Sequence, residues 1–409
     1  MASARSPLAP AAFPALPAVS GVQCAIGRLG LYRHAREDLL VFTFPEGTSI
    51  GGALTNSSTR SADVDWCRAG LKRGQARALV CNAGNSNAFT GEAGLAKNAA
   101  TVAAVTQALG CRPEDVFLAA TGVIGQPLPP LIIADALPAL WPQRGAPDWQ
   151  RAALAFSTTD TFPKGAGAIS EIGGGRVAIS GIAKGSGMIA PNMATMLAFV
   201  FTDAALAPKV AQSLVDRLIP GTFNSISVDG DTSTSDTFLF LATGASGAPR
   251  IEDLADPRLA DFEAALRGVL HDLALQIVRD GEGAQKLIEI TVEGAKDEAS
   301  ARRIAFAIAN SPLVKTAIGG GDANWGRVVM AVGKSGEPID LSRLAVRFCG
   351  HWTARDGGAI AYDSAKVDAA LAKVEVDVLV DVGLGTGRAR VWTCDLTRGY
   401  IEINGDYRS

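Results

Sequence analysis

Thr195 is a hydroxyl residue placed where a glycine-containing segment of the chain runs into an apolar one. The preceding residues, 184–191, contain two glycines and end in a proline, which excludes a regular helix or a central strand there. Residues 194–201 then form an apolar run of strand length. A side chain at such a junction is held rigidly by the strand, and the exposed loop leaves it accessible to a substrate. Thr195 is therefore a candidate nucleophile. The plain alternative is a loop that enters a buried strand and has no chemical role.

Histidine and cysteine offer little chemistry of their own in this sequence. The six cysteines are scattered without a C-x-x-C pair, which in a chain of this length indicates reduced thiols and no disulfide framework. The three histidines, His34, His271 and His351, show no spacing typical of metal ligands. We therefore expect no metal site. A histidine-dependent mechanism is disfavoured, because none of the three lies beside a plausible nucleophile in the sequence.

Two glycine clusters could bind phosphate or another anion. Residues 383–387 (G-L-G-T-G) look like part of a dinucleotide fingerprint, but a strand-like segment follows where that motif needs a helix. Residues 318–322 (I-G-G-G-D) precede an expected helix over 325–332 and could form an anion-binding nest. In both cases we favour a turn that uses the backbone freedom of glycine.

Two expected elements would position further polar residues. A buried strand over 116–120 ends at Thr121 and Gly122, so this pair lies at a strand tip. A long amphipathic helix over 266–277 runs toward Gly281, and Glu282 follows it. Taken alone, a Thr-Gly pair is a common turn and Glu282 an ordinary solvated acid at a helix end.

The composition is typical of a globular protein with a large buried core. It has 409 residues, 48% of them hydrophobic and 19% charged, so two lobes or one large layered domain are expected. The net charge of −3 and the lack of a dense Lys/Arg stripe argue against nucleic acid as a partner. No apolar run is long enough for a membrane span, and four prolines interrupt residues 1–20, which excludes a signal peptide. We expect a disordered leader over 1–20 and a cytoplasmic protein.

The remaining periodic segments favour an α/β chain in which helices cover layered sheets. A helix is expected over 95–109, with Gly110 as its stop. Alternating residues predict a strand over 287–293 and another over 374–382. The latter is expected to form a hairpin with residues 388–393 across the turn at 383–387.

The surroundings of Thr195 resemble the self-processing site of the ornithine acetyltransferases, the bifunctional glutamate N-acetyltransferase/amino-acid acetyltransferase family. Residues 184–197, K-G-S-G-M-I-A-P-N-M-A-T-M-L, carry the resemblance. It extends from about residue 20 to the C-terminus, and the segments that match in the same order are 81–91, 158–164, 279–283, 311–316, 324–327 and 404–409. Two departures concern the N-terminal lobe and substrate detail: Ala323 stands where the family commonly has proline, and residues 51–68 match loosely.

The resemblance implies a layered α/β/β/α sandwich of the self-processing aminopeptidase/ornithine acetyltransferase type. It also implies that the peptide bond between Ala194 and Thr195 breaks without another enzyme. The products would be an alpha chain, residues 21–194 behind the leader, and a beta chain, residues 195–409. These chains are expected to stay associated as (alpha-beta)2 or a larger assembly.

The implied activity is transfer of acetyl from N-acetyl-L-ornithine to L-glutamate by a ping-pong route through acetyl-Thr195, in arginine biosynthesis. Thr121 and Gly122 match the family's oxyanion-hole pair. Substrate contacts carry over to Thr158, Lys184, Thr195, Glu282, Asn404 and Ser409. No metal or cofactor is implied, and the resemblance leaves open whether acetyl-CoA also serves as an acetyl donor.

Two other functions stay open on the sequence alone. The first is a related self-processing aminopeptidase or hydrolase, in which water accepts the acyl group. The second is an uncleaved, non-catalytic protein that keeps the family fold and binds a small molecule.

Overall fold

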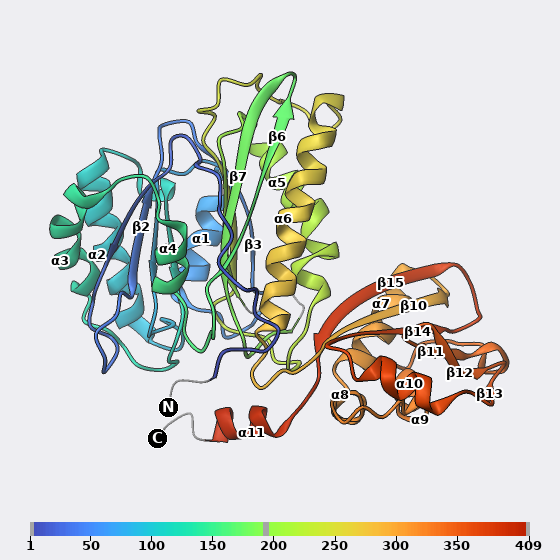
Figure 1. Cartoon of the computed structure of the whole chain (residues 1–409). Helices are drawn as coiled ribbons and strands as arrows, with labels where there is room; N and C mark the ends of the chain where they lie inside the picture. The colour runs from blue at the N-terminus through green and yellow to red at the C-terminus, as the bar shows by residue number, and fades with distance from the viewer. Residues whose placement is uncertain (1–3, 191–195, 406–409) are drawn as a thin grey trace.

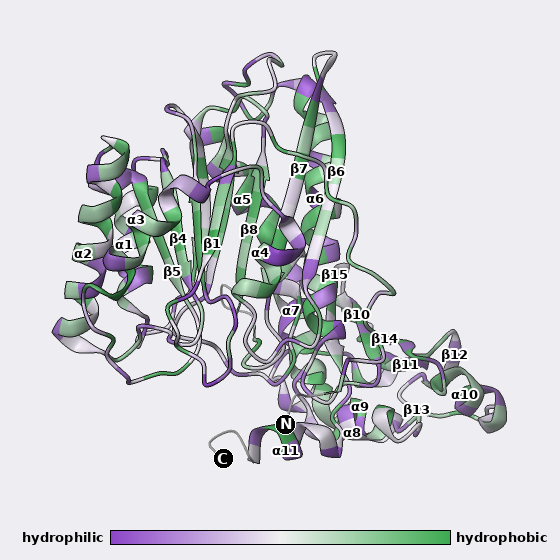
Figure 2. Ribbon diagram, turned by 60° about the vertical axis from the view of Figure 1, so that its left-hand side comes forward, coloured by the Kyte–Doolittle hydropathy of each residue, from purple (hydrophilic) through white to green (hydrophobic). Residues whose placement is uncertain are grey.

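The computed structural model describes residues 4–190 and 196–405. Figure 1 shows two parts: a larger sandwich of two sheets between layers of helices, and a smaller lobe built around a third sheet. The chain leaves the sandwich after helix α6 (Ala260–Arg279) and ends in helix α11 (Arg398–Gly405). Helix α11 lies close to the N-terminal segment in both Figure 1 and Figure 2.

The first sheet of the sandwich has the strand order β1-β2-β4-β5. Its strands are β1 (Gln23–Gly27), β2 (Leu39–Thr43), β4 (Ala78–Asn82) and β5 (Val116–Ala120). Neighbours are antiparallel except β4 and β5, which are parallel. Every residue of β2, β4 and β5 is buried, because both faces of this sheet are covered. That double burial explains why the strands are continuous apolar runs.

The second sheet has the order β3-β9-β8-β7-β6. Its strands are β3 (Ser49–Leu54), β6 (Lys164–Ile172), β7 (Gly175–Lys184), β8 (Leu197–Thr202) and β9 (Thr237–Ala242). Strands β8 and β9, which follow the predicted cleavage point, lie between β3 and β7, which precede it. The register pairs Lys184 with Leu197, and Leu197 with Thr237.

Helices cover the outer face of each sheet. Helices α2 (Gly91–Leu109) and α3 (Ile132–Leu140) share an apolar core with the first sheet. Helices α5 (Pro208–Leu218) and α6 share another with the second sheet. Between the two sheets lies a third core, in which the rings of Phe42 and Phe201 are 4.8 Å apart. Figure 2 shows apolar residues running along these strands. The predicted α/β/β/α layering is thus confirmed.

Several shorter elements complete the sandwich and its connections. Helices α1 (Ala62–Leu71) and α4 (Trp149–Ala155) contribute side chains to the core between the sheets. Single-turn 3₁₀ helices are formed by Pro113–Asp115, Trp141–Gln143, Ile219–Gly221, Phe223–Ser225, Pro257–Leu259 and Leu341–Arg343. The helix expected over 95–109 is the greater part of α2, and Gly110 ends it with a φ of 60°.

The third sheet has the order β13-β12-β11-β14-β10-β15. Its strands are β10 (Leu287–Ala295), β11 (Ala345–Phe348), β12 (His351–Arg355), β13 (Gly358–Ala359), β14 (Glu375–Asp381) and β15 (Gly387–Cys394). Its helices are α7 (Glu298–Ala309), α8 (Pro312–Gly319), α9 (Trp325–Lys334) and α10 (Ser364–Leu371).

One strand pairing in this lobe differs from the sequence prediction. The strand expected over 374–382 and the one expected over 388–393 are present as β14 and β15, but β10 lies between them. The expected hairpin is therefore wrong. Strand β10 pairs in parallel with β14 and antiparallel with β15, which gives this mostly buried strand a neighbour on each side. Alternation marks the buried face of a strand but does not identify its neighbours.

The two glycine clusters form turns in this lobe. The loop at 383–387 leads into strand β15 and not into a helix. The cluster at 318–322 connects α8 to α9, and Gly321 has a φ of 76°. The 383–387 loop lacks the following helix that a nucleotide fingerprint needs, which agrees with the preferred turn. The 318–322 cluster does precede a helix, so the choice there between a turn and an anion-binding nest stays a prediction.

Residues 4–20 lie against the sandwich, which differs from the disordered leader expected from the sequence. Phe13 and Leu16 pack against the core between the two sheets, and Val19 is buried. Ser180 Oγ donates a hydrogen bond to the carbonyl of Pro17 at 2.6 Å. The prolines that argue against a helix suit an extended segment of this kind, and its few apolar residues are enough to anchor it.

Candidate active site

The ends of β5 and β7 place Thr121 and Lys184 against each other across the space between the two sheets. Thr121 directly follows β5, and Lys184 is the last residue of β7. Lys184 Nζ donates a hydrogen bond to Thr121 Oγ1 at 3.2 Å. Lys184 points toward the first sheet because side chains alternate along a strand, and Ile182, two residues earlier, lies in the core between the sheets.

The turn at Thr121 and Gly122 has two donors to offer a ligand. The amide of Thr121 is already bonded to the carbonyl of Asn82 at 3.0 Å, so its hydroxyl is the donor that remains. Because Lys184 donates to Oγ1, the hydroxyl proton is left to point elsewhere. Gly122 has a φ of 127°, and a Cβ there would lie 2.6 Å from Asn85 N, so the position requires glycine. Its amide is the second donor.

An asparagine-rich loop after β4 supports that turn. Asn82 Nδ2 donates to the carbonyl of Asn85 at 2.9 Å, and Asn85 Nδ2 donates to the carbonyl of Gln126 at 2.6 Å. Asn85 also pairs with Thr121 as an isolated β-bridge. These asparagines belong to residues 81–91, which carried part of the family resemblance, but the sequence did not indicate what they hold in place.

Asp160 joins Thr158 to the loop that follows Lys184. Its Oδ2 accepts from the amide of Thr158 at 3.0 Å, and its Oδ1 accepts from the amide of Gly185 at 2.7 Å. Lys164 Nζ lies 2.5 Å from the same Oδ1, and both side chains are almost completely buried. Burial alone would raise the pKa of Asp160, but the charges of Lys164 and Lys184 outweigh it and hold that pKa below its usual range.

The other carboxylate that pairs with Lys164 comes from the end of α6. Asp280 Oδ2 lies 2.5 Å from Lys164 Nζ and accepts from the amide of Thr161 at 2.9 Å. The N-terminal segment reaches the same place, where Ser6 donates through its amide to Thr161 Oγ1 and through its hydroxyl to the carbonyl of Arg279. Three distant segments therefore meet at this buried ion pair.

Glu282 lies next to the loop that follows Lys184. Its amide donates to the carbonyl of Ser186 at 2.9 Å, and a Cβ on Gly187 would lie 2.5 Å from the Glu282 carboxyl carbon. Asn404, in helix α11, donates through Nδ2 to Glu282 Oε2 at 2.8 Å. The C-terminal helix therefore returns to the site, as a substrate contact at Asn404 requires.

Strand β8 begins at this same end of the second sheet, with Leu197 paired to Lys184. Asp236, just before β9, is buried, and its Oδ2 has no hydrogen-bond partner among the described residues. Burial raises the pKa of Asp236 well above its ordinary value, although Lys184, Ser233 and the amide of Met196 act in the opposite direction. A buried acid thus flanks the first described residues after Thr195.

The structure brings together six of the nine predicted site residues. Ala194, Thr195 and Ser409 lie outside the described residues. The six are linked to one another by hydrogen bonds and by short stretches of chain: Thr121, Gly122, Thr158, Lys184, Glu282 and Asn404. The sequence analysis missed Asp160, Lys164, Asp280 and Asp236. The first three lie inside segments that resemble the family, and the spacing of Asp160 four residues before Lys164 was a signal that the sequence offered.

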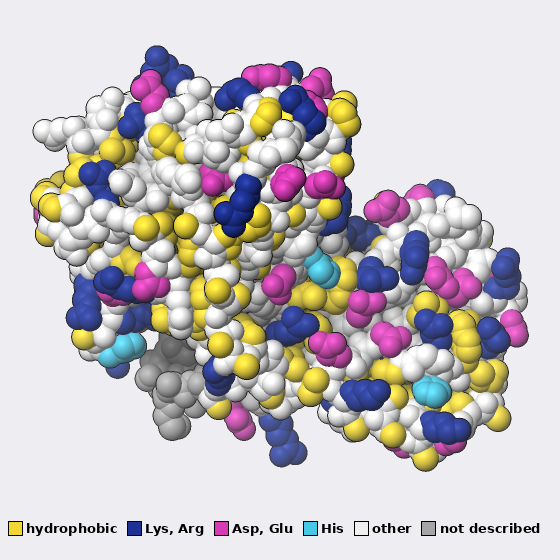
Figure 3. All heavy atoms as spheres, turned by 45° about the horizontal axis from the view of Figure 1, so that its top comes forward, with side chains coloured by type: hydrophobic (Ala, Val, Ile, Leu, Met, Phe, Trp, Pro, Cys, Tyr) yellow, Lys and Arg dark blue, Asp and Glu magenta, His cyan; other side chains and the backbone are white. Residues whose placement is uncertain are grey.

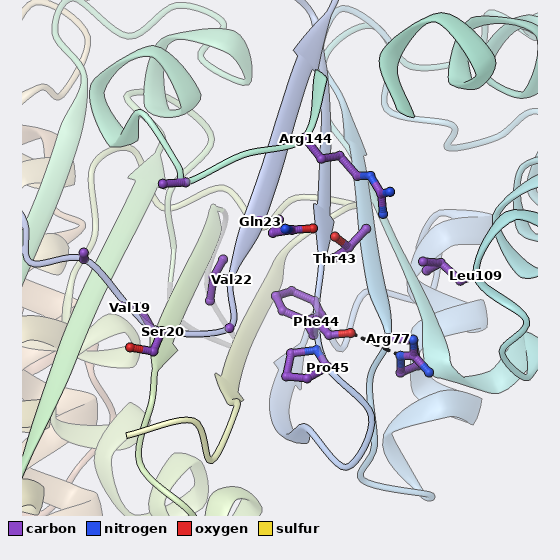
Figure 4. A pocket seen from close by; sticks show the side chains of 13 residues that line it. Val19, Ser20, Val22, Gln23, Thr43, Phe44, Pro45, Arg77, Leu109 and Arg144 are labelled. Atoms are coloured by element: carbon purple, nitrogen blue, oxygen red, sulfur yellow. Dashed lines mark hydrogen bonds between the residues drawn. The ribbon is translucent and has the colours of Figure 1, made fainter. Parts of the chain in front are cut away.

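A hollow of about 610 Å³ lies elsewhere on the sandwich and shares no lining residue with this site. Figure 4 shows Val19 and Val22 on one side of it and Arg77 and Arg144 on the other. The two guanidinium groups are engaged with the carbonyls of Phe44 and Trp141 respectively, at 3.1 and 2.8 Å. On the face shown in Figure 3, basic and acidic side chains are interspersed over the surface.

Within the described ranges, no three His, Cys, Asp or Glu side chains gather closely enough to hold a metal ion. No helix in that part of the chain combines the length and apolar character needed to cross a bilayer.

Comparison with known proteins gives matches over the whole chain. The profile of the ArgJ family matches residues 21–409. The arginine biosynthesis bifunctional protein ArgJ of Bradyrhizobium diazoefficiens is 53% identical over 413 residues, which cover 100% of both chains. The protein of the same name from Caulobacter vibrioides is 54% identical over 401 residues, which cover 97% of this chain and 100% of that one.

A solved structure is also similar. The crystal structure of the ArgJ protein from Bacillus halodurans is 39% identical, with a TM-score of 0.50. The match covers 52% of this chain and 100% of the crystallised chain.

Proposed function

Because this chain belongs to the ArgJ family, we propose that it is a self-cleaving acetyltransferase that moves acetyl from N-acetyl-L-ornithine to L-glutamate in arginine biosynthesis. Thr195 is the nucleophile in both the cleavage and the transfer. The name of the relatives, which joins arginine biosynthesis with two functions, supports this assignment.

One observation carries the proposal: the contact between Lys184 and Thr121 at the sheet end where β8 begins. Leu197 is paired with Lys184, and Thr195 precedes Leu197 by only two residues. Two residues of chain span at most about 7 Å. Only a short length of chain therefore separates Thr195 from the sheet end that carries Lys184, and we propose the hydroxyl of Thr121 and the amide of Gly122 there as the donors that stabilise the oxyanion.

Self-cleavage begins with attack of Thr195 Oγ on the carbonyl carbon of Ala194. The oxyanion is held by Thr121 and Gly122, the carbon–nitrogen bond breaks, and the nitrogen takes up a proton. The resulting ester is hydrolysed by water to the Ala194 carboxylate and a free Thr195 hydroxyl. The branched Cβ of threonine leaves little rotamer freedom to lose in reaching the reactive geometry.

The new α-amino group of Thr195 then serves as the general base. A free α-amino group has a pKa of roughly 7.7–8.0, which suits proton transfer near neutral pH. It accepts the hydroxyl proton as Thr195 Oγ attacks the acetyl carbonyl of N-acetyl-L-ornithine, and ornithine leaves with that proton. The amine of L-glutamate then attacks acetyl-Thr195 and regenerates the enzyme. No histidine is needed.

The described residues offer suitable partners for both amino-acid substrates. Lys184 and the hydroxyl of Thr158 can hold the α-carboxylate that ornithine and glutamate share. Glu282, with Asn404 beside it, can pair with the amine of the ornithine side chain. Ser409 would add a contact from the C-terminal tail, and acetyl-CoA remains a second candidate donor.

The length of the crystallised relative also supports cleavage. That chain matches this one over 52% of the 409 residues while being covered completely. Residues 195–409 are 215 of the 409 residues, which is a similar share. We expect the two chains to remain together in an (alpha-beta)2 or larger assembly.

The decisive experiment compares the purified protein with its Thr195→Ala variant. The wild type is expected to give two bands on a denaturing gel, with threonine at the N-terminus of the second, and to form N-acetylglutamate from N-acetylornithine and glutamate. Thr195→Ala is expected to stay as one chain of 42.2 kDa and to lose transfer.

The same experiment separates the alternatives. Release of free acetate with no N-acetylglutamate would indicate a hydrolase. A single full-length wild-type band without activity would indicate a non-catalytic binding protein. Transfer at the normal rate by Thr195→Ala would refute the proposal.

A further inference from the structure

Asp160 is surrounded by residues that are expected to bind substrate, yet its own carboxylate faces away from solvent. The side chain is 1% exposed, and its two oxygens accept from the amides of Thr158 and Gly185 and from Lys164 Nζ. These three partners all belong to the protein, and with only 1% of its side chain exposed Asp160 is not open to a bound substrate. Its effect on a reaction must therefore pass through Thr158 and Lys184.

Lys184 lies among charges from several elements, and Asp160 is the one with the largest opposing effect. Burial lowers the pKa of the Lys184 ammonium, the Asp160 carboxylate raises it, and Lys164 lowers it again. Smaller contributions that raise it come from Asp236 before β9 and Glu282 after α6. From the first sheet, the uncharged Thr121 hydroxyl contacts Lys184, and the buried thiol of Cys81 in β4 lies near enough to interact with its charge.

The geometry and the charge of Lys184 thus depend on the same side chain. Asp160 holds the amide of Gly185, the residue directly after Lys184, so it fixes the main chain from which the ammonium group extends. It also lies close enough to favour the charged form. A neutral lysine could not pair with a carboxylate, and a displaced one would not reach it.

We propose that Asp160 is a positioning residue for acetyl transfer, which holds the main chain of Thr158 and Gly185 and keeps Lys184 charged to receive the α-carboxylate of the amino-acid substrates. This inference rests on the proposed function. Asp160 itself does not touch substrate.

Two substitutions are expected to change the pH dependence in opposite directions. Asp160→Asn removes the charge that favours the Lys184 cation, so the pKa of Lys184 should fall. Lys164→Met removes a like charge that acts on Lys184 and leaves the charge of Asp160 in place, so the pKa of Lys184 should rise. Single charges at this range shift a pKa by about one unit.

The measurement is kcat/KM for N-acetyl-L-ornithine at saturating glutamate, followed from pH 6 to pH 11. In a ping-pong reaction this quantity reports the free enzyme, free N-acetyl-L-ornithine and the first half-reaction, so the amine of glutamate does not enter it. The side-chain amine of N-acetyl-L-ornithine does enter it, but equally for the wild type and every variant, so only differences between them are attributed to Lys184. The fall at high pH is expected about one unit lower in Asp160→Asn and about one unit higher in Lys164→Met. Circular dichroism and a denaturing gel would establish that each variant is folded and cleaved.

Asp280→Asn is the matched control. It removes the other carboxylate bonded to Lys164, but Asp280 contacts neither Thr158 nor Gly185. The alkaline fall of this variant is expected to stay at the wild-type pH, whatever its overall rate. A shift as large as that of Asp160→Asn would mean that any loss of buried charge produces the effect and would overturn the inference.

The remaining outcomes are distinguishable. The positioning role is refuted if the wild type is active and its kcat/KM falls at the same pH as that of both variants. It is also refuted if both variants shift the pH of this fall in the same direction. In either case the proposed function stands. If the wild type makes no N-acetylglutamate, both fall. If Asp160→Asn does not fold, Lys164→Met decides alone, since only an upward shift agrees with the inference.

Discussion

The hydroxyl of Thr121 is the donor that this residue can give to a reacting carbonyl, because its amide is already bonded to Asn82. Replacing it by valine keeps the branched shape and removes the donor. We expect Thr121→Val to lower both the rate of self-cleavage and the kcat of transfer by about 10²–10³-fold. Gel densitometry over time and initial rates of N-acetylglutamate formation measure the two.

Thr121→Ser is the corresponding control, since serine keeps the hydroxyl that Lys184 contacts. It should retain most of the activity. Full activity in Thr121→Val together with a loss in Thr121→Ser would show that the methyl group matters and the hydroxyl does not.

The buried carboxyl of Asp236 predicts a pH effect on stability. Its pKa is raised in the folded protein, mainly by burial, from an ordinary value of 3.8. The folded state therefore binds this proton more tightly than the unfolded state. Its contribution to stability is fully present below about pH 3.8 and is lost as pH rises through the folded pKa. Asparagine has the same shape and does not titrate.

As pH rises from 5 to 8, we expect the free energy of unfolding of Asp236→Asn to increase relative to that of the wild type. Urea titrations of both proteins at the two pH values measure the difference. Asp272→Asn, on helix α6 over the outer face of the second sheet, is a matched acid-to-amide control. A constant difference between wild type and Asp236→Asn would mean that the carboxyl is already charged in the folded protein.

At the scale of elements, the N-terminal segment packs closely against strand β6. A Cβ on Gly165 would collide with the ring of Phe13, 2.6 Å from its Cε2, so the strand has glycine where the ring lies. Because Phe13 packs against the core between the sheets, Phe13→Ala should cost about 1–3 kcal/mol in free energy of unfolding. Pro14→Ala, at an exposed neighbour, should cost much less.

The double variant tests that fit directly. Gly165→Ala should destabilise the wild type through collision with the ring, and should cost less when Phe13 is already alanine. Additive losses in the double variant would mean that the two residues do not contact each other in solution.

At the scale of the whole molecule, the order of the second sheet determines the fate of the cleaved chains. Strands from residues 195–409 are flanked on both sides by strands from residues 1–194. We expect the cleaved chains to co-elute in size-exclusion chromatography at any salt concentration and to separate only in denaturant. Separation under native conditions would contradict this sheet order.

Much of this architecture could be predicted from the sequence, and the failures have physical causes. The strand over 116–120 was predicted from a continuous apolar run, which suits a strand buried on both faces. The helix over 266–277 was predicted from the helical spacing of its buried side chains. The pairing of β14 with β10 was missed because alternation does not encode strand order. The folded leader was missed because its few anchors, such as Val19, are scattered among prolines.

The site shows the same division. Thr121, Lys184 and Glu282 could be named because their segments resemble a known family. The role of Asp160 could not, because it depends on amides of Thr158 and Gly185, and main-chain groups leave no signature in a sequence.

The two ends of the described chain have a practical consequence for anyone who prepares this protein. Ser6 is bonded to Arg279, and Asn404 to Glu282, so both ends lie beside the same short stretch after α6. An affinity tag joined to the described chain directly at Ser6 or Asn404 would start next to the proposed site and crowd it. An internal tag in the exposed turn at Gly173 and Gly174, between β6 and β7, would extend from a position that contributes nothing to the site.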